Sequence, residues 1–290
     1  MSCRRLAAIV LSTSLASASL LAQSLSPTDW GAPHVSVSHA DGHWTIAGKT
    51  NVVTLNDSNL AMDIKNGTIN WSMVPSGTND MLVETGGKKF YLRLADAKRI
   101  SIVPYRTGFK TGVKISLNEW PSDSAHSTVN LPVYLTVCLE GPDEDLVCDV
   151  AADERHGTVL RQLDWPTALD ARDVDYTVLS NGRGNLLPRD WPKEYFPIRR
   201  IKDGKIDPTD HSVLQSHVIE DWSMSWWGFQ KGKSAMMVIC ETPDDAAYQF
   251  SHPAGGPTVI GPRWLAALGK FGYPRSCRFC FFERGNYVTL

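Results

Sequence analysis

The chain has little cysteine, no excess of positive charge and no long apolar run after its first two dozen residues. Six cysteines in 290 residues are too few for a disulfide scaffold. The formal charge is −2, from 29 Lys and Arg against 31 Asp and Glu, and this excludes the basic field that nucleic-acid binding requires. The sequence also lacks the short motifs of serine hydrolases, zinc proteases, phosphate-binding loops and dinucleotide-binding folds. What it does have is a 42% hydrophobic composition, enough for a sizeable core.

The first residues have the composition of an export signal. Arg4 and Arg5 precede an apolar stretch, Leu6 to Leu21, and small residues follow at Ala22 and Ser24. This pattern predicts a cleaved signal peptide over residues 1–24 and a secreted or periplasmic protein with no membrane contact after cleavage. An uncleaved membrane anchor is the alternative. Cleavage removes two arginines, so the mature charge is 27 − 31 = −4, which favours neutral or cationic partners over nucleic acid.

Alternation of apolar and polar residues dominates the rest of the chain, whereas helical periodicity is scarce. The pattern predicts about eighteen strands at short spacing, too many for an immunoglobulin-sized sandwich. We therefore expect a mainly β fold: one large two-sheet antiparallel β-supersandwich over residues 25–290, with few short helices. Besides the two hairpins described next, the expected strands are Val52 to Leu55, Lys89 to Leu94, Ile100 to Val103, Gly112 to Leu117, Val129 to Leu139, Leu146 to Val150, Thr158 to Leu163, Tyr176 to Leu179, Val213 to Asp221, Ala235 to Glu241, Tyr248 to His252 and Cys277 to Phe282.

Two dipeptides predict tight hairpin turns. Asn66-Gly67 and Asp41-Gly42 each lie between alternating runs. Both dipeptides favour the positive φ angles that two-residue hairpin turns need. The partners expected across these turns are Ile64 with Ile69, Met62 with Trp71, Leu60 with Met73, Val37 with Ile46, and His39 with Trp44.

The five cysteines after the signal peptide are expected to be buried strand residues without a disulfide framework. Alternation places Cys138 and Cys148 on opposite faces of a sheet, and it separates Cys277 from Cys280 in the same way. The Cys-x-x-Cys spacing of the second pair leaves a metal or redox site as the alternative. We expect no metal and no cofactor.

The middle of the chain breaks the strand rhythm. Residues 181–197 hold three prolines and two glycines beside aromatic residues, so we expect a long, ordered and functional loop without regular structure. Within it, Arg189, Asp190 and Trp191 form a candidate sugar-binding set, because a charged pair can bind vicinal hydroxyls and an indole can stack on a pyranose ring. The alternative is that an Arg–Asp ion pair and the tryptophan anchor the loop to the sandwich.

Trp226 and Trp227 form a second candidate sugar-binding site, close in sequence to Glu220 and Asp221. Adjacent strand residues face opposite ways, so we expect one indole in the core and the other exposed; an exposed indole would be a stacking platform for a sugar. Core packing or an interdomain contact is the alternative.

Three acidic residues follow the expected strand that ends near residue 241. Asp244 and Asp245 can cap a short helix that begins at Pro243, or all three carboxylates, with Glu241, can bind calcium through their oxygens. We expect the helix cap.

Three stretches and the tail carry a resemblance to a known family. They are the hairpin region from Val53 to Met73, the segment from Gly184 to Pro188, the strand pair from Trp227 to Asp245, and the tail from Phe281 to Val288. In these stretches the chain resembles the N-terminal galactose-mutarotase-like β-supersandwich that precedes the (β/α)8 catalytic barrel of large secreted bacterial glycoside hydrolases. The resemblance implies a domain that supports a barrel which this chain does not include. The His and Glu pair of mutarotases has no residue-by-residue match, so no catalytic residue is assigned.

These observations lead to three hypotheses. The first is a non-catalytic, carbohydrate-associated N-terminal domain of an exported glycoside hydrolase, with carbohydrate and a C-terminal catalytic domain as partners. It predicts an apolar flank near residues 181–197 and the tail. The second is a self-sufficient sugar epimerase, lyase or hydrolase that uses His156, His211 or His217 with Glu220. The third is a stand-alone glycan-binding module.

Overall fold

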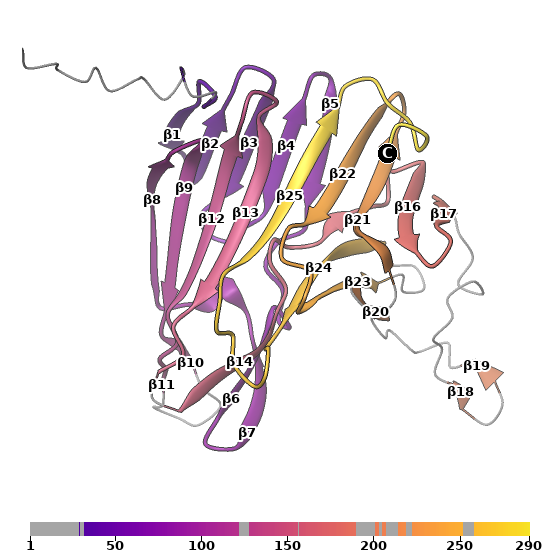
Figure 1. Ribbon diagram of the computed structural model, residues 1–290. Helices are drawn as coiled ribbons and strands as arrows, with labels where there is room; N and C mark the ends of the chain where they lie inside the picture. The colour runs from indigo at the N-terminus through magenta and orange to yellow at the C-terminus, as the bar shows by residue number, and fades with distance from the viewer. Residues whose placement is uncertain are drawn as a thin grey trace, which may run out of the picture.

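Short antiparallel strands make up most of the described chain, and they form two large sheets (Figure 1). The computed structural model describes residues 29, 32–121, 128–155, 157–189, 201–202, 205–206, 214–218, 222–251 and 258–290. Within these described residues, helical structure is limited to short segments such as the 3-10 turn η2 (Leu94–Asp96). The predicted fold class, a mainly β antiparallel sandwich with few short helices, is confirmed.

One sheet has twelve strands. Its main path runs β1-β2-β3-β4-β5-β15-β24-β14-β6-β7, with β23 paired to β24 and β20 paired to β23. The strands are β1 (Ser36–Ala40), β2 (His43–Ala47), β3 (Asn51–Asn56), β4 (Met62–Asn66), β5 (Ile69–Met73), β6 (Met81–Thr85), β7 (Lys88–Leu92), β14 (Thr158–Leu163), β15 (Leu169–Asp170), β20 (Leu214–His217), β23 (Ala246–Ser251) and β24 (Val259–Leu265).

The other large sheet has nine strands in the order β17-β16-β21-β22-β25-β13-β12-β9-β8. Its strands are β8 (Arg99–Thr107), β9 (Lys110–Asn118), β12 (Val133–Glu140), β13 (Asp145–Ala152), β16 (Tyr176–Asn181), β17 (Asn185–Pro188), β21 (Trp222–Lys231), β22 (Ser234–Cys240) and β25 (Arg275–Phe282). Two small ribbons accompany the sheets: β10 (Trp120–Pro121) with β11 (Thr128–Val129), and β18 (Ile201–Lys202) with β19 (Lys205–Ile206).

In the strands that enclose the core, alternate residues face the space between the two sheets. In β12, Val133, Leu135 and Val137 are fully buried, whereas Tyr134 and Thr136 face the opposite way and are partly exposed. This period of two is what a sheet with one covered face requires. We call the face that carries Tyr134 and Thr136 the outer face of the nine-stranded sheet. The most deeply buried indoles are those of Trp71, Trp120, Trp165, Trp227 and Trp264.

A buried carboxylate ties the two sheets together at one end. Glu144, in the turn between β12 and β13, accepts hydrogen bonds from the three backbone N–H groups of residues 49–51 at 2.5, 2.6 and 3.0 Å. These groups belong to the turn between β2 and β3 of the other sheet. The Asn51 side chain returns a hydrogen bond to the Glu144 carbonyl at 2.8 Å. Gly48 permits the approach, since a Cβ there would lie 2.4 Å from the carboxylate.

The hairpin that turns at residues 41–42 has the predicted register. Val37 lies opposite Ile46, and His39 lies opposite Trp44. The imidazole and indole rings of the second pair stack with centroids 4.7 Å apart. Both turn residues have positive φ, as the dipeptide predicts.

In the hairpin formed by β4 and β5, the turn lies one residue later than predicted, so the predicted strand register is wrong. Asn66 was expected in the turn, but it ends β4, and the turn lies at residues 67–68. The reason is that the Asn66 side chain is buried and donates to Asn51 Oδ1 at 2.7 Å, which draws residue 66 into the strand. The observed partners are Ile64 with Trp71 and Met62 with Met73.

The cysteine side chains lie as the alternation predicts. All five described cysteines are free thiols. Cys148 faces the core opposite Cys277, while Cys138 lies opposite Val147 on the outer face. Cys277 is fully buried, and Cys280 is partly exposed on the other face. Burial raises the pKa of the Cys240 thiol to about 12, so this group stays protonated near neutral pH.

The expectation of an irregular loop over residues 181–197 is wrong for part of that range. Residues 185–188 form β17, the edge strand of the nine-stranded sheet, with Pro188 opposite Tyr176. An edge strand tolerates proline because one side of it needs no backbone donor. β24 was also not predicted, because its Gly261-Pro262 pair interrupts the alternating pattern.

Candidate functional site

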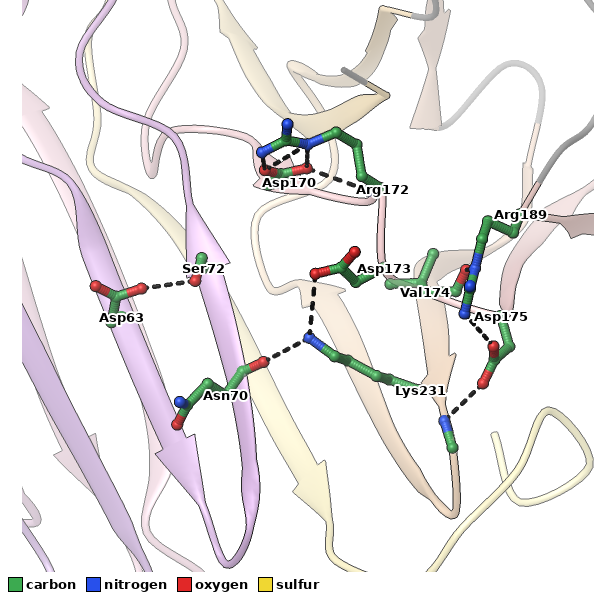
Figure 2. Close-up of polar contacts among 11 residues, drawn as sticks. Asp63, Asn70, Ser72, Asp170, Arg172, Asp173, Val174, Asp175, Arg189 and Lys231 are labelled. Carbon is green, nitrogen blue, oxygen red and sulfur yellow. Dashed lines mark hydrogen bonds and ion pairs between the residues drawn. The ribbon is translucent and has the colours of Figure 1, made fainter.

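Arg189, the one described member of the first predicted sugar-binding set, lies directly after the edge strand β17. Its Nη2 donates to Asp175 Oδ1 at 2.5 Å, and its Nε donates to the Val174 carbonyl at 3.2 Å (Figure 2). The sequence suggested Asp190 as its partner. The observed partner is Asp175, directly before β16. The Arg189 guanidinium therefore connects the end of β17 to the start of β16.

Asp175 connects three segments that are distant in sequence. Its Oδ2 accepts from the backbone N–H of Gly232 at 2.6 Å, in the turn between β21 and β22. The same carboxylate therefore holds Arg189 and that turn together (Figure 2). The side chains of Asp175 and Arg189 are 35% and 55% exposed, so water screens the pair and it contributes little free energy.

Lys231, at the end of β21, connects the nine-stranded sheet to β5 of the twelve-stranded sheet. Lys231 Nζ donates to the Asn70 carbonyl at 3.0 Å and lies 4.0 Å from Asp173 Oδ2. Close by, Arg172 forms a two-point contact with Asp170, at 2.9 Å from Nε and 2.5 Å from Nη2 (Figure 2). We call these six charged residues the edge cluster: Asp170, Arg172, Asp173, Asp175, Arg189 and Lys231.

The three carboxylates of the edge cluster each lie beside a basic side chain. Hydrogen bonds from Arg172 hold the pKa of Asp170 below its usual value, so this carboxyl is a poor proton donor. Three acidic and three basic side chains alternate at the surface, and such a surface can hydrogen-bond polar ligands or a protein partner.

The predicted opposite orientation of the tryptophan pair is observed. Trp227 is 1% exposed and packs against Trp222 and Tyr248, with ring centroids 6.0 and 6.3 Å apart. It is thus a core residue, the alternative that the sequence allowed, and offers no face to a sugar. Trp226 lies on the outer face and is partly exposed.

An apolar patch covers the outer face at the β16–β17 edge. Leu186, Tyr287 and Val288 are 43%, 44% and 76% exposed, and we call these three residues the tail patch. The Tyr287 ring packs edge-on against Tyr176 at 5.5 Å, and the Tyr287 N–H donates to Gln230 Oε1 at 2.9 Å. These contacts hold the C-terminal residues against the sheet.

The last residue extends this patch. A Cβ on Gly228 would lie 2.5 Å from the Leu290 Cδ1 atom, so the Leu290 side chain rests on the glycine. Gly228 lies opposite Val178, which lies opposite Leu186. The tail patch is therefore one surface across three strands, beside the edge cluster.

A network that the sequence analysis missed lies in the middle of the outer face. Arg278 in β25 contacts three carboxylates, those of Glu140, Asp145 at 3.2 Å and Glu241 at 2.7 Å. Burial raises the pKa of Asp145, and the hydrogen bond from Arg278 opposes this rise. The members come from three parts of the chain, the β12–β13 hairpin, residue 241 and β25, which the sheet brings together, so no local pattern marks them.

The predicted helix cap near residue 243 is wrong. Residues 241–245 form bends and a turn in which the Ala246 N–H donates to the Pro243 carbonyl at 3.1 Å. Glu241 accepts from Ser276 and Arg278, and Asp245 accepts from the Tyr273 hydroxyl. These partners occupy the carboxylates of Glu241 and Asp245, two of the three that the sequence offered for capping or for calcium.

Several sequence-predicted residues lie outside the described ranges. They are Asp190, Trp191, Glu220, Asp221, His156 and His211, and of His217 only the backbone, in β20, is described. Within the described ranges no three His, Cys, Asp or Glu side chains are grouped as metal ligands. In the same part of the chain, no helix has the length and apolar character needed to cross a bilayer.

No protein-family model matches the sequence, and no curated protein matches it either. Solved structures do share the fold. The alpha-N-acetylgalactosaminidase NagBb from Bifidobacterium bifidum matches with a TM-score of 0.64 at 18% identity over 83% of this chain in its Gal-NHAc-DNJ complex. Its GalNAc complex matches with a TM-score of 0.62 at 17% identity over 88% of this chain.

The galactosidase domain of the alpha-galactosidase-sucrose kinase AgaSK matches with a TM-score of 0.50 at 8% identity over 86% of this chain. The chain spans 36% and 37% of the two NagBb chains and 42% of the AgaSK chain. At these identities the likeness concerns the fold alone, and it agrees with the β-sandwich that the family resemblance implied.

Proposed function

We propose that this chain is a non-catalytic, carbohydrate-associated β-sandwich domain of an exported glycoside hydrolase, and that it supports a (β/α)8 catalytic domain that follows it. The observation that carries the proposal is the tail patch. It places exposed apolar side chains beside a charged edge cluster, at the point where residue 290 lies on the sheet. An apolar surface with a polar rim is typical of a protein interface.

The comparisons support the proposal in one respect. This chain covers little more than a third of NagBb, which is named as an alpha-N-acetylgalactosaminidase. A domain of this fold therefore occurs within a longer glycosidase chain. Signal-peptide cleavage near residue 24 and export belong to the same proposal and rest on the sequence pattern.

The electrostatics of the described surface support a non-catalytic role. A glycosidase needs one carboxyl with a raised pKa and a second, ionised carboxylate, both facing the same open site. On the outer face, burial raises the pKa of Asp145 near Glu140 and Glu241, but all three carboxylates contact the Arg278 guanidinium instead of facing an open site. At the edge cluster, Asp170 and Asp175 each contact an arginine.

The test compares this chain with a longer product of its gene. We expect the reading frame downstream of codon 290 to encode a (β/α)8 pattern, and the longer protein to hydrolyse aryl glycosides that residues 25–290 alone leave intact. Turnover of a glycan panel by residues 25–290 alone would instead establish the self-sufficient enzyme. A stop codon after residue 290 would exclude a catalytic domain on the same chain.

A further inference from the structure

A second surface of the nine-stranded sheet has the features of a ligand site. A pocket of about 420 Å³ opens on the outer face at β8, β9 and β12, at the opposite edge from the tail patch. This volume suits a monosaccharide-sized ligand, because small-molecule sites enclose about 300–1,000 Å³. Its lining consists of Lys98, Arg99, Ile100, Ser101, Ser116, Leu117, Asn118, Pro132 and Tyr134.

Three hydroxyl groups form a row in the pocket. Ser101, Ser116 and Tyr134 lie opposite one another on adjacent strands. Strands in a sheet lie about 4.8 Å apart, so the Cα atoms of these three residues form a line across the sheet, with their side chains on the same face. A hydroxyl both donates and accepts, and a tyrosine ring also offers an apolar face to the C–H groups of a sugar. This row fits a ligand with several hydroxyl groups.

The pocket is also basic. Lys98 and Arg99 line it, and Lys114 Nζ lies 5.0 Å from the centre of the Tyr134 ring. Both lining cations have one contact outside the lining: Lys98 Nζ donates to Thr128 Oγ1 at 3.4 Å, and Arg99 Nε contacts Glu119 Oε1 at 2.9 Å, so that carboxylate balances part of the charge. The lining itself contains no acidic side chain. In a chain of formal charge −2, this concentration of cations favours an anionic group.

We propose that this pocket binds a carboxylated sugar, a hexuronic acid or a residue of one in a glycan. The carboxylate lies against Lys98 and Arg99, and the ring hydroxyls contact Ser101, Ser116 and Tyr134. Charge-assisted hydrogen bonds from arginine or lysine to a carboxylate are stronger than neutral ones. The site is at the far edge of the sheet from the tail patch, so it does not depend on the proposed catalytic partner.

The experiment is a titration of residues 25–290, by calorimetry and by NMR shift mapping, with glucuronic acid, glucose and acetate. We expect glucuronic acid to bind about tenfold more tightly than either glucose or acetate, since each alternative lacks one of the two recognised groups. The double variant Lys98→Gln and Arg99→Gln is expected to weaken glucuronic acid binding by about tenfold or more. Tyr134→Phe with Ser116→Ala is expected to weaken glucuronic acid and leave acetate unchanged.

Arg106→Gln serves as the matched control, because this exposed arginine lies on the same strand β8 outside the pocket. It should leave every affinity unchanged, and circular dichroism should confirm that all variants are folded. Equal binding of glucose and glucuronic acid would overturn the role of the charges. Equal binding of acetate and glucuronic acid would show that the pocket recognises only the anionic group, which contradicts a sugar site. If no probe binds, the proposal is wrong.

Discussion

At the scale of single residues, we expect the removal of the Glu144 side chain to lower the stability of the fold strongly. It is buried and satisfies three backbone N–H groups of the opposite sheet. We predict that Glu144→Ala lowers the free energy of unfolding by about 2–4 kcal/mol, because buried donors lose a charged acceptor. Urea denaturation measures this. Asp143→Ala, at the exposed neighbouring position, is the control and should change the free energy of unfolding little. An equal loss in both variants would contradict the role of the three hydrogen bonds that Glu144 accepts.

Asp80 provides a pH dependence with a definite sign. Burial raises its pKa from 3.8 to about 6, against the hydrogen bonds that it accepts from Ser76, Gly77 and Leu94. The folded protein therefore holds this proton more tightly than the unfolded chain. Its contribution to stability is fully present below pH 4 and is lost as the pH rises through 6.

The variant Asp80→Asn isolates this effect. We predict that the stability of the wild type relative to Asp80→Asn falls by about 2 kcal/mol between pH 4 and pH 7, because one pKa unit corresponds to about 1.4 kcal/mol. Denaturation curves of both proteins at the two pH values give the difference, and the other titrating groups cancel. A difference that rises with pH would show that the hydrogen bonds outweigh burial.

At the scale of elements, β9 and β12 approach too closely for a side chain at one position. A Cβ on Gly112 would lie 2.0 Å from the Val137 carbonyl oxygen. We predict that Gly112→Ala destabilises the protein by about 2–4 kcal/mol, because the two strands must separate. Gly272→Ala is the matched control, since a Cβ there meets nothing within 4 Å. Thermal unfolding of the two variants measures the difference, and similar melting temperatures would contradict the prediction.

The two hairpins show how far sequence patterns predict these elements. The turn at residues 41–42 was predicted correctly because turn chemistry and alternation suffice there. The prediction for the turn after β4 was wrong because the Asn66 side chain donates a hydrogen bond to Asn51 on the neighbouring strand. The alternating pattern contains no information about this contact. Similarly, Arg189 was recognised as a candidate from its segment, but its partner Asp175 was not, because the pairing of β16 and β17 brings them together.

At the scale of the whole molecule, the alternation predicted the two-sheet sandwich but not the placement of its outer-face sites. The Arg278 network and the hydroxyl row both arise from strand register, which brings together residues as far as 138 positions apart. The position of the tail patch was anticipated, because the sequence placed an apolar flank near residues 181–197 and the tail. Of the three patch residues, one lies in the first of these segments and two in the second.

The tail patch therefore gives the last prediction, which concerns association of the whole domain. Residues 25–290 alone should bind a hydrophobic dye and self-associate, because Leu186, Tyr287 and Val288 remain exposed. The double variant Leu186→Ser and Val288→Ser should reduce both signals severalfold without loss of folding. Tyr91→Ser with Phe109→Ser, at exposed positions away from this edge, is the control and should leave most of the signal. A soluble monomer that binds no dye would show that this surface needs no partner, and would count against the proposed catalytic domain.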